Sequence, residues 1–206
     1  MVNTGSVRQR HSHQVAPADN PKIARFQRAA HKVIVVIPAR HEAADVGEVV
    51  HSVVAAGLPV VVVDDFSADG TADIARRAGA SVLQMPFHAG AWAAIQAGMR
   101  FARQRGCEFV ATLDADGQHN PADLESLLHQ LDGPAPPNVV IGACLDRANR
   151  RRRLAWRVLR WLSGLDVQDL TSGFRVYDRK AIDLLDRPHQ TLLEYQDVGV
   201  LLCLHA

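Results

Sequence analysis

The stretch that decides the fold is Phe109-Val110-Ala111-Thr112-Leu113-Asp114-Ala115-Asp116, an apolar run that ends in two aspartates one residue apart. The apolar part is typical of a buried β-strand. In open α/β sheets, ligands bind in the crevice outside the carboxyl ends of the strands. Aspartate oxygens suit Mg²⁺ or Mn²⁺, and such ions usually also hold substrate phosphates. The stretch therefore predicts a metal–diphosphate site at Asp114 and Asp116, although an Asp-x-Asp pair is also common in solvated turns.

Two earlier apolar runs have the same form. Val33-Ile34-Val35-Val36-Ile37-Pro38 is a β-branched run closed by a proline, and Pro59-Val60-Val61-Val62-Val63-Asp64-Asp65 ends in two acids. Between them, residues 42–56 place valines at helical spacing before Gly57, which favours the end of a helix. Buried strands that alternate with helices predict an α/β fold with a mainly parallel sheet and right-handed crossovers.

The remaining elements continue this alternation as far as residue 142. We expect strands at 81–84, 109–113 and 139–142 and helices at 72–78, 90–105 and 121–131, with Ser67 or Thr71 capping the helix of residues 72–78. Beyond Arg147 the pattern changes to a helix, a short strand near 174–177 and two more helical segments. The expected architecture is a single Rossmann-like domain over residues 32–206, preceded by a flexible basic tail over residues 1–31.

The composition is that of an ordinary soluble domain. Of the 206 residues, 48% are hydrophobic and 22% are charged, and the formal net charge of +1 gives no indication of a nucleic-acid partner. No apolar run approaches the roughly 18 residues needed to cross a bilayer, and the polar N-terminus lacks the core of a secretory signal. Three widely separated cysteines fit neither a disulfide framework nor a zinc site, so we expect a reducing, cytoplasmic location.

Acidic residues follow three of the expected strands, in the segments 38–42, 64–65 and 114–116. Because the carboxyl ends of parallel strands meet at one edge of a sheet, we expect these carboxylates to lie close together. They would repel one another unless a cation or hydrogen-bond donors compensate. A metal-bound nucleotide supplies such a cation, and the acids can also accept hydrogen bonds from a ribose or a base. The alternative for Asp64 and Asp65 is that they only cap the turn that follows them.

Four motifs in this order carry a resemblance to a known family. They are Val-Ile-Pro-x-x-x-Glu at 36–42, Val-Val-Asp-Asp-x-Ser-x-Asp-Gly-Thr at 62–71, Leu-Asp-Ala-Asp-Gly-Gln-His at 113–119 and Thr-Ser-Gly-Phe-Arg at 171–175. The chain resembles family-2 inverting glycosyltransferases with the GT-A fold over roughly residues 33–204. Within that family it is most similar to the branch of dolichol- and polyprenyl-phosphate sugar transferases. The resemblance implies a GDP- or UDP-sugar donor, a polyprenyl-phosphate acceptor and a divalent metal, and it leaves the sugar open.

The resemblance also implies a role for each matching residue on the donor side. Pro38, Arg40 and Glu42 match the first nucleotide-contacting loop, and Asp65 matches the acid that reads the nucleobase. Further donor-side residues are Asp114 and Asp116, which match the aspartates at the ribose and the metal-held diphosphate, Ala115 between them and the neighbouring Gln118.

On the acceptor side, Gly173, Phe174 and Arg175 match the segment that closes over the acceptor, and we expect Arg175 to act in catalysis. Asp197 resembles a late acidic position that serves as a base in several family members. A polyprenyl phosphate is already anionic and needs no strong base. For Asp197 the alternative is therefore a helix N-cap.

Two cations of the family pattern are missing. The segment usually read Asn-x-Gly-Lys-Gly is His-Ala-Gly-Ala-Trp at 88–92, and the strand usually ending in Gly-Ser-Arg reads Gly-Ala-Cys at 142–144. Arg147 or Arg175 are candidates to replace them, and the chain also ends where relatives usually continue. A second hypothesis is therefore a catalytically weakened nucleotide-binding or interaction module of the same fold. A nucleotidyltransferase is disfavoured because the first loop is acidic and free of glycine.

A basic segment over residues 150–162 has helical spacing, with arginines on one face and Leu154, Val158, Trp161 and Leu162 on another. A basic amphipathic helix with tryptophan suits an anionic lipid surface or a lipid-phosphate acceptor, which predicts peripheral association with the inner face of a membrane. The alternative is a helix packed on the sheet with a solvated basic face. The oligomeric state is not indicated by the sequence.

Overall fold

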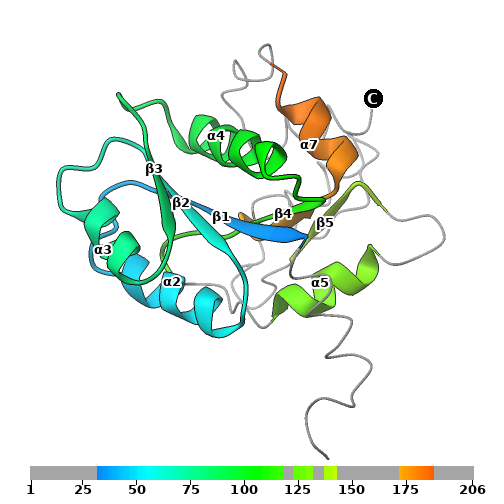
Figure 1. Ribbon diagram of the computed structural model, residues 1–206, viewed down its shortest axis with the longest axis horizontal. Helices are drawn as coiled ribbons and strands as arrows, with labels where there is room; N and C mark the ends of the chain where they lie inside the picture. The colour runs from blue at the N-terminus through cyan, green and yellow to red at the C-terminus, as the bar shows by residue number, and fades with distance from the viewer. Residues whose placement is uncertain (1–31, 118–122, 132–136, 143–171, 188–206) are drawn as a thin grey trace, which may run out of the picture.

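A six-stranded sheet forms the middle layer of the computed structural model, which describes residues 32–117, 123–131, 137–142 and 172–187 (Figure 1). The strand order is β3-β2-β1-β4-β6-β5. The strands are β1 (Val33–Ala39), β2 (Val60–Asp64), β3 (Ser81–Gln84), β4 (Phe109–Thr112), β5 (Val139–Ile141) and β6 (Arg175–Tyr177). The pairs β1–β2, β1–β4 and β2–β3 are parallel, whereas β6 is antiparallel to both β4 and β5. The expected α/β fold with a mainly parallel sheet is confirmed.

Helices cover both faces of the sheet. Figure 1 shows α2 (Val46–Ala55), α3 (Thr71–Arg77) and α5 (Leu124–Gln130) on one face and α4 (Ala91–Gln104) and α7 (Arg179–Leu185) on the other. The two helices of the second face are joined by ion pairs from Arg100 and Arg103 of α4 to the buried Asp186, at 2.6 and 2.9 Å. Each face of the central strands is therefore shielded from water, as a parallel sheet requires.

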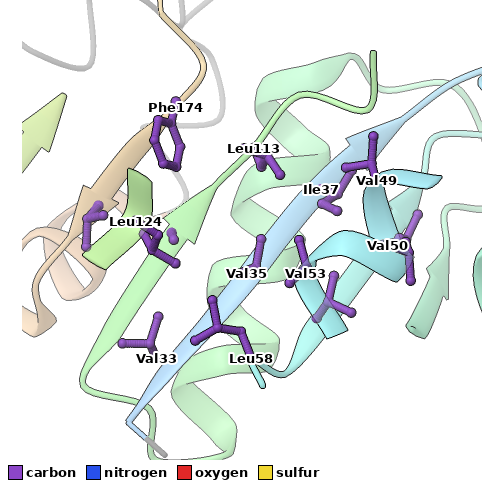
Figure 2. Close-up of a cluster of buried hydrophobic side chains, with 14 of the residues drawn as sticks. Val33, Val35, Ile37, Val49, Val50, Val53, Leu58, Leu113, Leu124 and Phe174 are labelled. Atoms are coloured by element: carbon purple, nitrogen blue, oxygen red, sulfur yellow. The ribbon is translucent and has the colours of Figure 1, made fainter. Parts of the chain in front are cut away.

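The residues of β1 explain why this strand lies in the centre. Successive side chains of a strand point to opposite faces. Val35 and Ile37 pack in the core under α2, whereas Ile34 and Val36 pack in the core under α4. Figure 2 shows Val35 and Ile37 on the side of β1 that faces Val53 of α2. A run that is apolar at every position satisfies both faces, and it holds the end of β1 rigidly in the middle of the sheet.

The helix boundaries correct two expectations. The first helix begins at Val46 and not at residue 42, and the backbone N–H groups of Glu42 and Ala43 donate to Thr71 Oγ1 and Asp69 Oδ2 of the neighbouring loop. The prediction that Ser67 or Thr71 caps α3 is wrong. The N-cap is Gly70 without a side-chain cap, since both hydroxyls accept hydrogen bonds from the β1–α2 loop instead.

The other strands and helices that can be compared lie within a few residues of their expected positions. The N-terminal tail, the basic segment 150–162, Gln118 and Asp197 lie outside the described residues. Within the described ranges, no helix combines the length and the apolar character that a membrane crossing needs.

Candidate functional site

A pocket of about 370 Å³ lies at the carboxyl ends of β1, β2 and β4. It contains residues of all three segments that the sequence singles out. Its lining consists of Pro38, Ala39, Arg40, Glu42, Asp65, His88, Ala91, Asp114, Ala115 and Asp116. The expected convergence of the strand ends is therefore confirmed, and the pocket lies where α/β sheets bind ligands.

Two loops that bear pocket residues are fastened to each other. The N–H of His41, after β1, donates to Ser67 Oγ after β2 at 3.0 Å, and the N–H of Glu42 donates to Thr71 Oγ1 at 3.0 Å. His41 and Phe66 both have left-handed backbone conformations, with φ of 57° and 63°. Such a conformation costs a non-glycine residue on the order of 1 kcal/mol and persists only where the surroundings impose it. The two loops thus hold the pocket edge in a fixed shape.

Asp64 and Asp65 are equally buried but have different tasks. Asp64 Oδ1 accepts a hydrogen bond from the N–H of Ser67 at 3.2 Å, so the turn-capping alternative describes Asp64. Asp65 instead accepts from the N–H groups of Ala89 and Gly90 at 2.8 and 2.9 Å and binds His88 at 2.7 Å. Burial raises the pKa of Asp65, but these hydrogen bonds outweigh it together and leave the pKa lowered. Asp65 is therefore a stable anion that fixes the loop before α4.

Arg40 and His88 extend this arrangement across the pocket. His88 Nδ1 lies 2.7 Å from Asp65 Oδ2, and His88 Nε2 lies 2.8 Å from Arg40 Nη1. A guanidinium can only donate hydrogen bonds, so Nε2 accepts and Nδ1 carries the proton that is donated to Asp65. We call these three residues the Asp65–His88–Arg40 chain. It joins the ends of β2, β3 and β1 across the rim of the pocket.

The pocket also contains an acidic cluster of Glu42, Asp114 and Asp116. Burial raises the pKa of Glu42, and the negative charges of Asp45, Asp116, Asp69 and Asp114 raise it further, in that order. The two aspartates of the cluster are thus close enough to repel the Glu42 carboxylate. A positive charge placed among them would remove this repulsion.

The position of Asp114 depends on β6. Thr112, at the end of β4, donates a hydrogen bond from its hydroxyl to the carbonyl of Gly173 at 2.6 Å. A Cβ atom at Gly173 would overlap both carboxylate oxygens of Asp114, so a larger residue at this position would force the Asp114 side chain to move. Gly173 therefore contacts a pocket residue but does not itself line the pocket.

The donor set of the acidic cluster fits a divalent cation that arrives with a phosphate ligand. Across the described residues, no three or more His, Cys, Asp or Glu side chains are grouped so that they could hold a metal by themselves. Mg²⁺ and similar ions are commonly held by only one or two carboxylates together with substrate phosphates. Asp114 and Asp116 match that requirement, with Glu42 adding negative charge nearby.

Arg175 lies elsewhere. It is 3% exposed on β6, its Nε donates to the carbonyl of Ser172 at 2.8 Å, and it is absent from the pocket lining. The structure therefore brings Pro38, Arg40, Glu42, Asp65 and residues 114–116 together, but it places Arg175 in the sheet. The sequence singles out His88 only as part of a departure from a motif. Its place in the loop between β3 and α4 is the available signal for a pocket residue.

Comparison with known proteins places the chain in a family. The model of Glycosyl transferase family 2 matches residues 34–186. Polyprenol monophosphomannose synthase of Mycolicibacterium smegmatis is 30% identical over 179 residues, which cover 77% of this chain and 66% of the relative. Undecaprenyl-phosphate mannosyltransferase of Micrococcus luteus is 31% identical over 142 residues, which cover 62% and 57%. This chain thus spans about two thirds or less of the length of these relatives.

Solved structures support the fold. Mannosyl-3-phosphoglycerate synthase from Rubrobacter xylanophilus superimposes with a TM-score of 0.65 at 24% identity, covering 80% of this chain and 59% of the other. Glucosyl-3-phosphoglycerate synthase from Mycobacterium tuberculosis, in complex with Mn²⁺, UDP and glucosyl-3-phosphoglycerate, has a TM-score of 0.62 at 22% identity, covering 76% and 60%. The fold is that of the GT-A enzymes, and the chain belongs to glycosyl transferase family 2.

Proposed function

We propose that this protein transfers a sugar from a nucleotide-sugar donor to a polyprenyl phosphate, with a divalent cation at Asp114 and Asp116 and with inversion at the anomeric carbon. The observation that carries the proposal is the pocket itself. Glu42 is repelled by Asp114 and Asp116, and these three carboxylates share the pocket with a guanidinium at the strand ends of a family-2 fold. The acceptor follows from the relatives, whose names specify polyprenol and undecaprenyl-phosphate mannose transfer.

The chemistry requires stabilisation of the leaving group. When the bond between the anomeric carbon and the phosphate oxygen breaks, the electron pair goes to the diphosphate. A divalent cation supplies the positive charge that this leaving group needs. In this chain, Asp114 and Asp116 would hold that cation, and the strand ends fix both residues in place.

The acceptor needs little activation. A polyprenyl phosphate already carries an anionic oxygen, which attacks the anomeric carbon from the face opposite the diphosphate and so inverts the configuration. The part of this chain that binds the acceptor is proposed to include the segment around Gly173, as the resemblance implies. A lipid-phosphate acceptor further predicts peripheral association with a membrane surface.

A transfer assay tests the proposal. Radiolabelled UDP- and GDP-sugars are incubated with undecaprenyl phosphate and Mn²⁺ or Mg²⁺, and label in the lipid phase is measured. Wild-type protein is expected to form a lipid-linked sugar only with metal, and Asp116→Ala is expected to lose on the order of 10²-fold or more in rate. The far-ultraviolet circular dichroism of the variant checks that the fold is intact.

Three results would contradict the proposal: transfer without metal, wild-type rates in Asp116→Ala, or no transfer with any donor. If the last result accompanied normal binding of nucleoside diphosphate, the chain would be a nucleotide-binding module of the same fold. The observation that favours this second candidate is the absence, at residues 88–92, of the lysine of the family pattern.

A further inference from the structure

Among the described residues, Arg40 is the one side chain of the pocket lining with a permanent positive charge, and it is hydrogen-bonded to a histidine. Arg40 is exposed at the end of β1, where an arginine side chain has many accessible rotamers. Its Nη1 nevertheless lies 2.8 Å from His88 Nε2. His88 in turn is fixed by Asp65, which is 2% exposed. A buried anion thus sets the orientation of a guanidinium through an imidazole.

We propose that His88 is a positioning residue for the nucleoside end of the donor. Through its bond to Asp65 it keeps Nε2 as an acceptor, and through Nε2 it holds Arg40 so that the remaining guanidinium N–H groups bind the nucleoside. This inference rests on the proposed function, because it concerns the same donor.

The sheet order indicates which end of the donor Arg40 meets. In the order β3-β2-β1-β4, His88, Asp65 and Arg40 follow β3, β2 and β1, whereas Asp114 and Asp116 follow β4. If the acidic cluster takes the metal-bound diphosphate, a nucleotide that spans the pocket places its nucleoside toward β1 and β2. The Asp65–His88–Arg40 chain therefore faces the nucleoside.

The hydrogen bonds of Asp65 leave Arg40 as the residue of this chain with the most donors open to the nucleoside. Oδ1 of Asp65 accepts from the Ala89 N–H, and Oδ2 accepts from the Gly90 N–H and from His88. A carboxylate has about four acceptor sites, so Asp65, which lines the pocket, has about one left for the nucleoside. The guanidinium of Arg40, at the exposed end of the chain of hydrogen bonds, has several free N–H donors for a ribose or base oxygen.

The experiment measures nucleotide affinity in variants of this chain of residues. Isothermal titration is performed with UMP and GMP without metal and with UDP and GDP in the presence of Mn²⁺. For the nucleotides that the wild type binds, Arg40→Ala and His88→Ala are each expected to weaken binding of the monophosphate and of the diphosphate by the same factor, about tenfold. Asp116→Ala is expected to weaken only the metal-dependent binding. The exposed His51→Ala on α2 is the control.

Three further measurements separate a positioning role of His88 from mere support of the loop before α4. The loop before α4 keeps the Ala89 and Gly90 bonds to Asp65 without His88, so His88→Ala should fold. The double variant Arg40→Ala/His88→Ala is expected to bind no more weakly than Arg40→Ala alone. His88→Gln, whose amide has one donor and one acceptor group, is expected to restore affinity. In the transfer assay, His88→Ala should raise the KM for the donor more than it lowers kcat.

The outcomes distinguish this inference from the proposed function. If the wild type binds a nucleotide and His88→Ala binds it equally well, or if the losses of the two single variants add in the double variant, the inference is wrong while the proposed function stands. If His88→Gln fails to rescue affinity, the positioning role is likewise wrong. If the wild type binds none of the four nucleotides, the proposed function fails and this inference fails with it.

Discussion

The two sides of the pocket carry similar side chains in opposite electrostatic states. On one side Asp65 is surrounded by donors, and its pKa is lowered. On the other side Glu42 lies among Asp45, Asp116, Asp69 and Asp114, and its pKa is raised by burial and by their charges. The Asp65 carboxylate is surrounded by donors from the protein, whereas the Glu42 carboxylate is repelled by its neighbours, and an added cation would reduce that repulsion. The comparison shows that burial of an acid does not by itself indicate a cation site, whereas repulsion among neighbouring acids that raises a pKa does.

Among the variants that test this comparison, the largest effect is expected at Gly173, which precedes β6 and contacts Asp114. Gly173→Ala introduces a Cβ that overlaps both oxygens of Asp114, so the carboxylate must move. We expect the transfer rate to fall on the order of 10- to 100-fold, because displacement of a ligating group by about an ångström is costly. The free energy of unfolding should fall by about 1–3 kcal/mol, measured by urea denaturation.

A double-mutant cycle isolates the cause. In an Asp114→Ala background the carboxylate is gone, so Gly173→Ala should then cost little stability. An equal loss of stability in both backgrounds would show that the alanine is strained for another reason, and the proposed support of Asp114 by Gly173 would be wrong.

The sequence was sufficient for the parallel part of the sheet and for the acids that follow its strands. The runs 33–37, 60–64 and 109–112 are apolar at nearly every position, and such runs form central strands whose ends converge. The capping prediction for Ser67 and Thr71 failed because local sequence does not show a competing partner. Both hydroxyls bind a loop that is distant in the chain, with Ser67 lying 26 residues from His41.

The burial of Arg175 and the contact between Gly173 and Asp114 were beyond sequence reasoning for the same physical reason. Both depend on the antiparallel pairing of β6 with β4, in which Thr112 lies opposite Arg175. Such pairing joins segments about sixty residues apart, at a register that no short motif specifies.

A smaller effect, on stability alone, is expected from the Asp65 side. Asp65→Asn places an amide NH₂ against donors of the loop before α4, and we expect a loss of about 1–3 kcal/mol at neutral pH. Because the folded-state pKa of Asp65 is lowered, its contribution is present above the ordinary aspartate pKa, about 3.9, and is lost as pH falls through the folded value. The difference between wild type and variant should therefore narrow below about pH 4.

Asp64→Asn is the matched control for this measurement. Asp64 is equally buried, and an asparagine oxygen can still accept the hydrogen bond from the Ser67 N–H, so only the long 3.5 Å bond from Gln84 Nε2 to Oδ2 is lost. Its cost at neutral pH should be the smaller of the two. A larger cost for Asp64→Asn, or a difference at Asp65 that does not change with pH, would contradict the description of Asp65 as the stabilised anion.

The smallest effect on stability is expected at Glu42, where the substitution should stabilise the protein instead of destabilising it. Since the folded-state pKa of Glu42 is raised, the fold is favoured below the ordinary glutamate pKa, about 4.3, and this advantage is lost as pH rises through the folded value. Glu42→Gln removes the repelled charge and should make the ligand-free protein more stable at pH 7 by about a few tenths of a kcal/mol, less at high salt.

Glu48→Gln is the control for this prediction. It removes the same charge from the first turn of α2, where the helix dipole favours a negative charge, and it should slightly destabilise the protein.

Addition of Mn²⁺ with a nucleoside diphosphate should reverse the order of stability of the wild type and Glu42→Gln, because the thermal midpoint of the wild type rises more than that of the variant. The same carboxylates repel one another without ligand and bind the cation with it. Glu42→Gln should therefore raise stability without ligand and reduce the stabilisation by metal and nucleotide. A Glu42→Gln variant that is more stable without ligand but equally stabilised by metal and nucleotide would place the cation away from the acidic cluster.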